Sequence, residues 1–434
     1  MTLSVAVVGA GPSGFYAADA MLKAFPGCEV DIIDRWPVPF GLVRYGVAPD
    51  HLSTKNVVKL YEKIFDKPGI RFLGNVEVGR DVSYEELKSF FDVVILACGM
   101  EYPKQFDIPG AELDGVVPVT DFVGWYNGVP ESPDFFQLVS RARSAVIVGN
   151  GNVALDVARL LAKTKAELVP TDIVPMAADA ISVAPLSNIY VVGRRGPLEA
   201  NFSFPELSEF GNLRDAEPIV DPRSLPVDAT SVAEKERKKK ERNLRVLRTF
   251  SEKTAGDKSV KVHLLFFMSP VGILGEPEIN AVKMVRNTLV DGKAVATKDT
   301  FMLDADLLVP AIGYQSAPIT GVPTREGGSA MRHQDGRVEA GVYVVGWARR
   351  GPTGVIGTNR VDSREVVDRI VVDSPTAFRQ GSVGLDNLLS SREVNVVAVA
   401  DWRRINEAEM RGVVNGRPRT KFTTVVEMLK LLSG

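Results

Sequence analysis

A strand that runs into a glycine-rich turn occurs twice in this 434-residue chain, and this repeat restricts the fold more than any other feature. The first copy begins with SVAVVGA at residues 4–10, continues through the turn GAGPSG at 9–14 and enters the helical stretch FYAADAMLKAF. A second strand, CEVDIID, ends at Asp34, which lies 25 positions after Gly9. This order of strand, GxGxxG turn, helix, strand and acid is typical of a dinucleotide-binding βαβ unit.

Each residue type in this turn has a physical reason. Glycines permit a tight turn and a close approach of the backbone to a pyrophosphate, and the N-terminus of the following helix favours its negative charge. An acid at the end of the second strand accepts a hydrogen bond from a free ribose 2′-hydroxyl. We therefore predict that Gly9, Gly11, Gly14 and Asp34 bind a dinucleotide without a 2′-phosphate, such as FAD. The alternative is a glycine-rich turn that has no ligand.

The second copy differs at its acidic position. AVIVG at residues 145–149 enters GNGNVA at 149–154, the helical stretch LDVARLLAKT follows, and the later strand IYVVG ends in Arg194 and Arg195. Gly149 and Arg194 are 45 positions apart, so a loop or an extra helix is expected at 166–188. Two guanidinium groups can bind a 2′-phosphate through charge-assisted, bidentate hydrogen bonds, whereas an acid would repel it. This copy is therefore predicted to bind NADPH; the alternative is a surface pair of arginines in a turn.

The two halves also close with similar strands, FDVVILACG at 91–99 and ADLLVPAIG at 305–313. A chain of this length is expected to hold two or three domains. The fold class is therefore α/β, with two Rossmann-like dinucleotide-binding domains. The duplication by itself allows either two bound dinucleotides or one unit that has lost its ligand.

Composition narrows the function classes. Cys28 and Cys98 are the only cysteines, and they do not form a CxxC motif. Two cysteines exclude a disulfide framework, and the missing CxxC excludes a redox pair like that of thioredoxin reductase. The low cysteine content also favours a reduced, intracellular setting. With three histidines in the chain, no metal site is predicted. A net charge of −2 gives no reason to expect a nucleic-acid partner. We expect no membrane span, and no cleavable presequence because strand-like residues begin by Val5.

Six longer segments closely resemble the adrenodoxin reductase family. They are PVPFGLVRYGVAPDH (37–51), GNVEVGRDV (74–82), DFVGWYNG (121–128), GNGNVALDVARLL (149–161), VVGRRGPLE (191–199) and GWARRGPTGVIGTN (346–359). The resemblance runs from residue 4 to the C-terminal segments DWRRINEAEMRG and GRPRTK. It implies an NADPH-dependent flavoprotein reductase of ferredoxins, located in the mitochondrial matrix in eukaryotes and in the cytoplasm in bacteria.

The resemblance also implies a domain plan and a set of cofactor contacts. The FAD-binding domain would comprise residues 1–105 and 325–434, with the NADP-binding domain, 106–324, inserted between them. FAD would contact the first glycine turn with Ser13, and also Asp34, Leu42, Val78, Trp347, Gly354, Val355 and Ile356. NADPH would lie against Asn150, Gly151, Asn152, Val153, Arg194, Arg195, Glu206 and Gly354. Asp34 is one methylene shorter than the family's usual glutamate, and Glu199 and Asn201 stand where relatives often have glutamine and alanine.

The implied reaction is hydride transfer from NADPH to FAD, followed by two single-electron transfers to an iron–sulfur ferredoxin. Gly354 would let the nicotinamide approach the flavin, although a turn with positive φ would also require a glycine. In this family the segments that carry His51 and Asp156 approach each other near the flavin from different domains. A water-linked pair there would hold the domains in register or pass protons, whereas a lone histidine is more often structural.

The segment EKERKKKERNLRVLR, residues 234–248, carries eight basic and three acidic side chains at helical spacing. It is either a solvated charged helix, the usual meaning of such a run, or a docking surface for an acidic [2Fe–2S] ferredoxin of the adrenodoxin type. A nucleic-acid patch would need interleaved aromatic residues, which are missing here.

Alternatives to the reductase also remain. They are an NADPH-dependent monooxygenase, a protein like the small subunit of glutamate synthase, and a flavin-binding protein without catalysis. The glutamate-synthase subunit carries N-terminal cysteine clusters, which this chain lacks.

Overall fold

The computed structural model describes residues 2–252, 256–316, 318–324, 331–413 and 416–433. The chain forms two compact units. Unit 1 comprises Met1–Tyr102, Asn127–Ser132 and Gly313–Gly434, and unit 2 comprises Pro103–Tyr126 and Pro133–Ile312. Residues 127–132 and 313–324, which the sequence assigns to the NADP domain, thus lie in unit 1. The short strands β5 (Tyr102–Pro103) and β14 (Tyr314–Gln315) lie where the chain passes from one unit to the other.

Unit 1 is built on a six-stranded sheet in the order β15-β16-β4-β1-β2-β3. All neighbouring strands are parallel except β15, which is antiparallel to β16. The strands are β1 (Ser4–Val8), β2 (Glu29–Ile33), β3 (Ile70–Leu73), β4 (Val93–Leu96), β15 (Arg337–Glu339) and β16 (Val342–Val344). The predicted strands at 4–10, 28–34 and 91–99 are confirmed as β1, β2 and β4.

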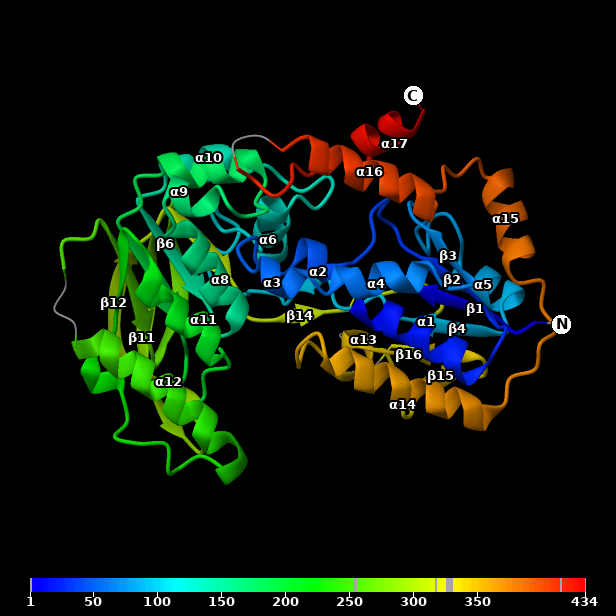
Figure 1. The fold of residues 1–434 in the computed structure, drawn as a ribbon. Helices are drawn as coiled ribbons and strands as arrows, with labels where there is room; N and C mark the ends of the chain where they lie inside the picture. The colour runs from blue at the N-terminus through cyan, green and yellow to red at the C-terminus, as the bar shows by residue number, and fades with distance from the viewer. Residues whose placement is uncertain (1, 253–255, 317, 325–330, 414–415, 434) are drawn as a thin grey trace. The chain divides into compact units, whose positions relative to one another are not determined.

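Continuous apolar runs form this sheet because both of its faces are covered. Val5 and Val7 of β1 belong to one core cluster, while Ala6 and Val8 belong to the cluster on the opposite face. Helices α1 (Pro12–Ala24) and α14 (Thr358–Asp373) pack together, as Figure 1 shows. The remaining helices are α2 (Leu42–Tyr45), α3 (Leu52–Lys55), α4 (Val58–Phe65), α5 (Tyr84–Phe90), α13 (Trp347–Arg350), α15 (Ser382–Ser391), α16 (Val399–Arg411) and α17 (Val425–Ser433).

Unit 2 repeats the plan with a five-stranded parallel sheet in the order β13-β6-β7-β9-β8. Its strands are β6 (Ser144–Val148), β7 (Asn188–Val192), β8 (Ala216–Ile219), β9 (Val260–Leu265) and β13 (Leu307–Pro310). A separate antiparallel sheet comprises β10 (Met268–Gly275), β11 (Ile279–Val290) and β12 (Lys293–Asp304). The predicted strands at 145–149, 189–193 and 305–313 are thus confirmed as β6, β7 and β13.

The helices of unit 2 include the two that the sequence singles out. The insertion expected at 166–188 contains α10 (Pro175–Val183), and the basic run lies in α12 (Glu234–Glu252). The others are α6 (Val119–Asn127), α7 (Phe136–Arg141), α8 (Asn152–Leu161), α9 (Lys165–Leu168) and α11 (Phe204–Glu209), with the 3₁₀ turns η1 (Phe210–Asn212) and η2 (Pro222–Ser224). Among the described residues, none of the helices combines the length and the apolar character needed to cross a membrane.

Candidate dinucleotide-binding sites

The first glycine turn joins β1 to α1 and leaves no room for side chains at two of its glycines. Gly9 has φ +111°, and a Cβ there would lie 2.6 Å from the carbonyl oxygen of Ala97. A Cβ at Gly14 would overlap the carbonyl oxygen of Gly9, so α1 can begin this close to β1 only with glycine at that position. At Gly11, by contrast, the Cβ position has no atom within 4 Å. The space beside Gly11 fits the close approach of a pyrophosphate.

Asp34 follows β2 directly and binds this turn. Its Oδ2 accepts the Ala10 N–H at 2.7 Å, and its Oδ1 accepts the Trp36 N–H at 3.0 Å. Burial raises the pKa of the Asp34 carboxyl, although the two backbone donors and Arg35 act in the opposite direction. A carboxylate has about four acceptor positions, so Asp34 can still accept a ribose hydroxyl while it closes the turn.

The neighbouring Arg35 has a carboxylate partner of its own. Its Nη1 lies 2.8 Å from Oε2 of Glu101, and both side chains are partly exposed. The guanidinium carbon of Arg35 also lies 4.8 Å from the centre of the Trp36 ring. The positive charge after β2 is therefore already paired within unit 1.

A short segment covers the first turn. The Phe40 N–H donates to the Ala10 carbonyl at 2.8 Å, and a Cβ at Gly41 would lie 3.0 Å from Cα of Gly11. Phe40 has φ +89°, which is uncommon for a bulky residue and often accompanies functional sites. Leu42, a predicted FAD contact, comes next and is 38% exposed. The covering segment of the first turn, residues 40–42, thus brings Leu42 close to the glycines.

A buried ion pair supports this covering segment. Arg44 on α2 donates in bidentate fashion to the Glu409 carboxylate on α16, with one N···O distance of 3.0 Å. Arg419 also contacts Glu409, at 3.2 Å. Burial alone would raise the pKa of Glu409, but the adjacent Arg44 holds it below its ordinary value. Sequence reasoning missed this support because the paired residues lie 365 positions apart.

The other predicted FAD contacts lie on three segments of unit 1. Ser13 Oγ donates to Asn359 Oδ1 at 3.1 Å, and a Cβ at Gly346 would overlap that hydroxyl, which places Ser13 against the turn before Trp347. Val78 follows β3, and the Val76 N–H donates to the Asp34 carbonyl at 2.9 Å. Ser13 therefore lies against the segment that leads to Trp347, and Asp34 is hydrogen-bonded to the segment that leads to Val78.

Gly354 lies in a turn that requires glycine. It has φ +85°, and a Cβ would lie 2.7 Å from Oγ1 of Thr358, which accepts the Val355 N–H at 3.1 Å. Val355 is 75% exposed and Ile356 is half-buried. The turn geometry accounts for this glycine by itself, and the predicted approach of a nicotinamide stays a prediction.

The second glycine turn joins β6 to α8 and repeats the geometry of the first. Gly149 has φ +148° and donates to the Val192 carbonyl at 2.8 Å, as Gly9 donates to that of Ile33 at 2.7 Å. A Cβ at Gly149 would overlap the Ala311 carbonyl oxygen, and the Cβ position of Gly151 has no atom within 4 Å. The space beside Gly151 therefore fits a second pyrophosphate.

The strand register gives the position of the arginines relative to that of Asp34. Val8 pairs with Ile33 and Val148 pairs with Val192, so the residue equivalent to Asp34 is Gly193. A Cβ at Gly193 would overlap the side-chain amide of Asn150, which fills this place. The acid is therefore replaced by glycine, and the two arginines follow one and two residues later.

Arg194 and Arg195 lie on a loop whose backbone is held on several sides. Asn287 Nδ2 donates to the Arg194 carbonyl at 2.9 Å, and the Phe267 N–H donates to the Arg195 carbonyl at 3.1 Å. Glu199 accepts the Gly196 N–H at 3.0 Å and so closes the same loop. Within the described ranges neither guanidinium forms an ion pair, in contrast to Arg35. Both are available to an anionic ligand.

A covering segment also lies on the second turn. The Asn150 carbonyl accepts the N–H groups of Asn201 at 2.8 Å and Phe202 at 3.1 Å. Asn152 Oδ1 accepts the Ser203 N–H at 2.8 Å. The covering segment of the second turn, residues 200–203, is thus equivalent to residues 40–42 of unit 1, and Asn201 is equivalent to Phe40.

Beyond this segment, Glu206 lies in the first turn of α11. Its Oε2 is buried and has no hydrogen-bond partner among the described residues. A buried acceptor of this kind is expected to meet a donor, and a ligand hydroxyl could supply it.

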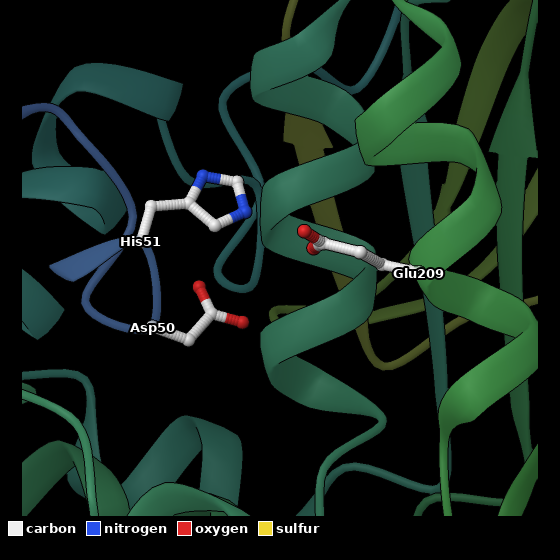
Figure 2. Close-up of side chains that lie close together, drawn as sticks. All are labelled: Asp50, His51 and Glu209. Atoms are coloured by element: carbon white, nitrogen blue, oxygen red, sulfur yellow. The ribbon is translucent and has the colours of Figure 1, made fainter. Parts of the chain in front are cut away.

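Asp156 and His51 each have contacts within their own unit. In unit 2, Arg159 Nη1 lies 2.7 Å from Oδ1 of Asp156 on α8, and its Nε lies 3.0 Å from Oε2 of Glu209, the last residue of α11. In unit 1, the His51 N–H donates to the Ala48 carbonyl at 3.0 Å just before α3. Figure 2 shows the side chains of Asp50, His51 and Glu209. The predicted pairing of His51 with Asp156 stays a prediction, because the two residues belong to different units.

Known proteins resemble the chain over its full length. The model of the pyridine nucleotide-disulphide oxidoreductase family matches residues 3–181. NADPH-ferredoxin reductase FprA of Mycobacterium leprae is 37% identical over 99% of this chain and 98% of its own. Human mitochondrial NADPH:adrenodoxin oxidoreductase is 39% identical over 99% of this chain and 92% of its own. The structure of Mycobacterium tuberculosis FprA in complex with NADPH superposes with a TM-score of 0.95, at 35% identity and complete coverage of both chains.

The chain belongs to the adrenodoxin reductase family. The resemblance inferred from the sequence motifs and the α/β fold class with two Rossmann-like domains are thereby confirmed. Family membership agrees with the local geometry, since both turns leave space beside their second glycine and differ in charge after the second strand. Sequence reasoning missed Glu101, Glu409 and Glu209, whose partners are distant in the chain.

Proposed function

We propose that this adrenodoxin reductase family member is an NADPH:ferredoxin oxidoreductase that uses FAD. The observation that carries the proposal is the chemical difference between two turns of equal backbone geometry. Asp34 follows the strand in unit 1, whereas Gly193 follows it in unit 2, with two arginines after it that have no ion pair among the described residues. FAD would be held in unit 1 and NADP in unit 2, because an acid suits a free 2′-hydroxyl and guanidinium groups suit a 2′-phosphate.

In unit 1 the residues position FAD rather than react with it. When bound, FAD supplies the chemistry that side chains lack, namely acceptance of a hydride and release of single electrons. The space beside Gly11 would admit the pyrophosphate, and Asp34 would accept the ribose hydroxyl while it holds the turn. We assign Leu42, Val78, Trp347, Val355 and Ile356 to the same cofactor from the family motifs.

In unit 2 the residues select and orient NADPH. Gly193 removes the acid that would repel a 2′-phosphate, and Arg194 and Arg195 bind that phosphate. The space beside Gly151 would admit the pyrophosphate, and Glu206 offers an unused acceptor to a ligand hydroxyl. We assign Asn150, Asn152, Val153 and Gly354 to NADPH from the family motifs.

The electron acceptor is an iron–sulfur ferredoxin, and we propose an acidic [2Fe–2S] protein that docks on α12. Five basic side chains of this helix are exposed at spacings that place them on one face, Lys235, Lys238, Lys239, Arg242 and Arg245. Opposite charges across such an interface mainly raise the association rate and orient the partner, and salt weakens them. By the same resemblance, the protein would act in the mitochondrial matrix of a eukaryote or in the cytoplasm of a bacterium.

We also propose that His51 and Asp156 act together, either to hold the domains in register or to pass protons. His51→Ala should then slow electron delivery to ferredoxin or alter its pH dependence while FAD stays bound. Electron transfer that is unchanged across pH would assign His51 to packing instead.

One anaerobic experiment tests the proposed function. The purified protein should be yellow with noncovalently bound FAD, NADPH should bleach it, and an added ferredoxin should restore the colour. Bound FAD that NADPH fails to bleach would indicate a flavin-binding protein without catalysis. Turnover that needs oxygen and an organic substrate would favour a monooxygenase, and colourless folded protein that takes up no added FAD would exclude a flavoprotein.

A further inference from the structure

One lysine of α12 does not lie on its exposed basic face. Lys240 is only 8% exposed, whereas its neighbours Lys238 and Lys239 are exposed. Together with Asn243, Leu244 and further apolar residues, it belongs to the buried face of the helix. Lys240 therefore does not belong to the proposed docking face of the run 234–248, since it lies against the body of unit 2.

Lys240 and Asn243 hold the covering segment of the second turn from the side of α12. Lys240 Nζ donates to the Ala200 carbonyl, and Asn243 Nδ2 donates to the Phe202 carbonyl at 3.2 Å. The other side of this segment donates to Asn150 and Asn152, as described above. The segment is thus fixed between the helix and the glycine turn, and it follows directly on the loop that carries the two arginines.

The charge of Lys240 is incompletely compensated. Burial lowers the pKa of its ammonium group, the nearby positive charges of Lys239 and Arg195 lower it further, and Glu236 and Glu199 act in the opposite direction. Within the part of the chain that the structure describes, Lys240 forms no ion pair. A buried cation near another cation is costly unless an anion offsets both. An anion beside Arg195 would therefore offset both positive charges.

We propose that Lys240 is a specificity and positioning residue for the 2′-phosphate of NADPH. Its positive charge adds to that of Arg195 and strengthens the attraction for a phosphate dianion, while its hydrogen bond to Ala200 keeps the covering segment on the second glycine turn. The inference rests on the proposed assignment of that turn to NADP. Lys240 on α12 would thus be a third cation near the phosphate, in addition to Arg194 and Arg195.

Two substitutions separate the charge from the hydrogen bond. Lys240→Met removes both, and Lys240→Gln removes the charge but keeps an N–H donor. Both should raise the KM for NADPH and the Kd for 2′,5′-ADP about 5- to 20-fold, the size expected for one nearby charge in a partly solvated site. In Lys240→Gln, which keeps an N–H donor for Ala200, the kcat and the kcat/KM with NADH should change less than about twofold, because NADH lacks the phosphate that the charge acts upon. Lys238→Met, assayed by 2′,5′-ADP binding, is the matched control, since it removes an exposed charge two residues before Lys240 on the opposite face of the helix.

The outcomes distinguish this inference from the proposed function. Unchanged 2′,5′-ADP affinity in both variants, or equal losses with NADPH and NADH in Lys240→Gln, would overturn the role of Lys240. If Lys240→Met fails to fold, Lys240→Gln and Lys240→Arg decide, because only the charge-retaining variant should keep the affinity of the parent protein. If Arg194→Ala with Arg195→Ala leaves the NADPH preference intact, the assignment of the second turn to NADP fails as well. If the double arginine variant loses the preference for NADPH but the Lys240 variants behave like the parent protein, only the proposed role of Lys240 is wrong.

Discussion

The two glycine turns share a backbone path but differ in the side chain that follows the second strand. In unit 1 the Asp34 carboxylate accepts the N–H of Ala10 and closes the turn. In unit 2 the equivalent residue is Gly193, and the amide of Asn150 takes its place. Arg35 and Arg194 are also equivalent, yet Arg35 is paired with Glu101 and Arg194 has no described ion pair. The two turns thus differ in partners that lie outside the motif as well as in the motif itself.

The supports behind the covering segments differ in the same way. In unit 1 a buried, bidentate ion pair between Arg44 and Glu409 supports the segment that includes Phe40. In unit 2 Lys240 and Asn243 donate to backbone carbonyls and leave a positive charge without an ion-pair partner among the described residues. The first turn is neutralised internally, whereas the second keeps positive charge for a ligand.

The largest expected effect comes from removing both arginines that follow Gly193. Each charge-assisted hydrogen bond contributes about 1.5–3 kcal/mol, so Arg194→Ala combined with Arg195→Ala should lower kcat/KM for NADPH by roughly 10²–10⁴-fold. NADH use should change little, and the flavin absorbance should stay as in the parent protein. Steady-state kinetics with both nucleotides measure this. Equal losses with NADPH and NADH would mean that the arginines only hold the loop.

The next effect tests the support in unit 1. Glu409→Gln leaves the buried Arg44 without its charged partner, which typically costs about 3–5 kcal/mol of the free energy of unfolding. Because the pKa of Glu409 lies below its ordinary value of 4.5, the ionised carboxylate stabilises the fold above pH 4.5. This stabilisation is lost as the pH falls through the lowered pKa, so the variant should show a weaker acid dependence.

Urea unfolding followed at several pH values measures this, and Glu407→Gln is the matched control. Glu407 lies on the same helix and is 63% exposed in its ion pair with Arg411. Its loss should cost less than about 0.5 kcal/mol. Similar unfolding midpoints for both variants would show that the buried pair does not support unit 1.

Sequence patterns identified the strands and turns because their determinants are local. β1 and β6 are continuous apolar runs, and each glycine spacing follows its strand directly. The supports were missed because they depend on contacts between distant segments, such as Arg44 with Glu409. Nothing in the local sequence around either residue indicates its partner.

Lys240 was missed for a different reason. It is the last of three consecutive lysines, 238–240, and the residue type alone does not distinguish it from Lys238 and Lys239. Its spacing to Leu244 and Leu247, four and seven positions later, does place it on the apolar face of a helix. Helical periodicity could therefore have separated the buried lysine from the exposed ones.

A smaller effect tests the third glycine position of the turn motif, which is Gly14 in unit 1 and Ala154 in unit 2. A methyl group at Gly14 would overlap the Gly9 carbonyl, so Gly14→Ala should destabilise unit 1 by about 1–3 kcal/mol and lower its FAD content. Ala154 already occupies the equivalent position in unit 2, and Ala154→Gly should cost only about 0.5–1 kcal/mol of helix stability. Thermal unfolding and the flavin-to-protein absorbance ratio measure both. Equal effects would mean that the two turns do not differ in how closely helix and strand approach.

The smallest expected effect separates the two faces of α12, the helix that supports only the second turn. Lys238→Glu combined with Lys239→Glu reverses two exposed charges and leaves the buried Lys240 in place. The KM for an acidic ferredoxin should rise severalfold at low salt, by about 1 kcal/mol, and the difference should shrink as salt screens the charges. NADPH-dependent reduction of ferricyanide should stay unchanged, because the covering segment of the second turn is untouched. Equal ferredoxin kinetics at low salt would assign this face to solvation, and a loss of ferricyanide reduction would mean that the two faces of α12 are coupled.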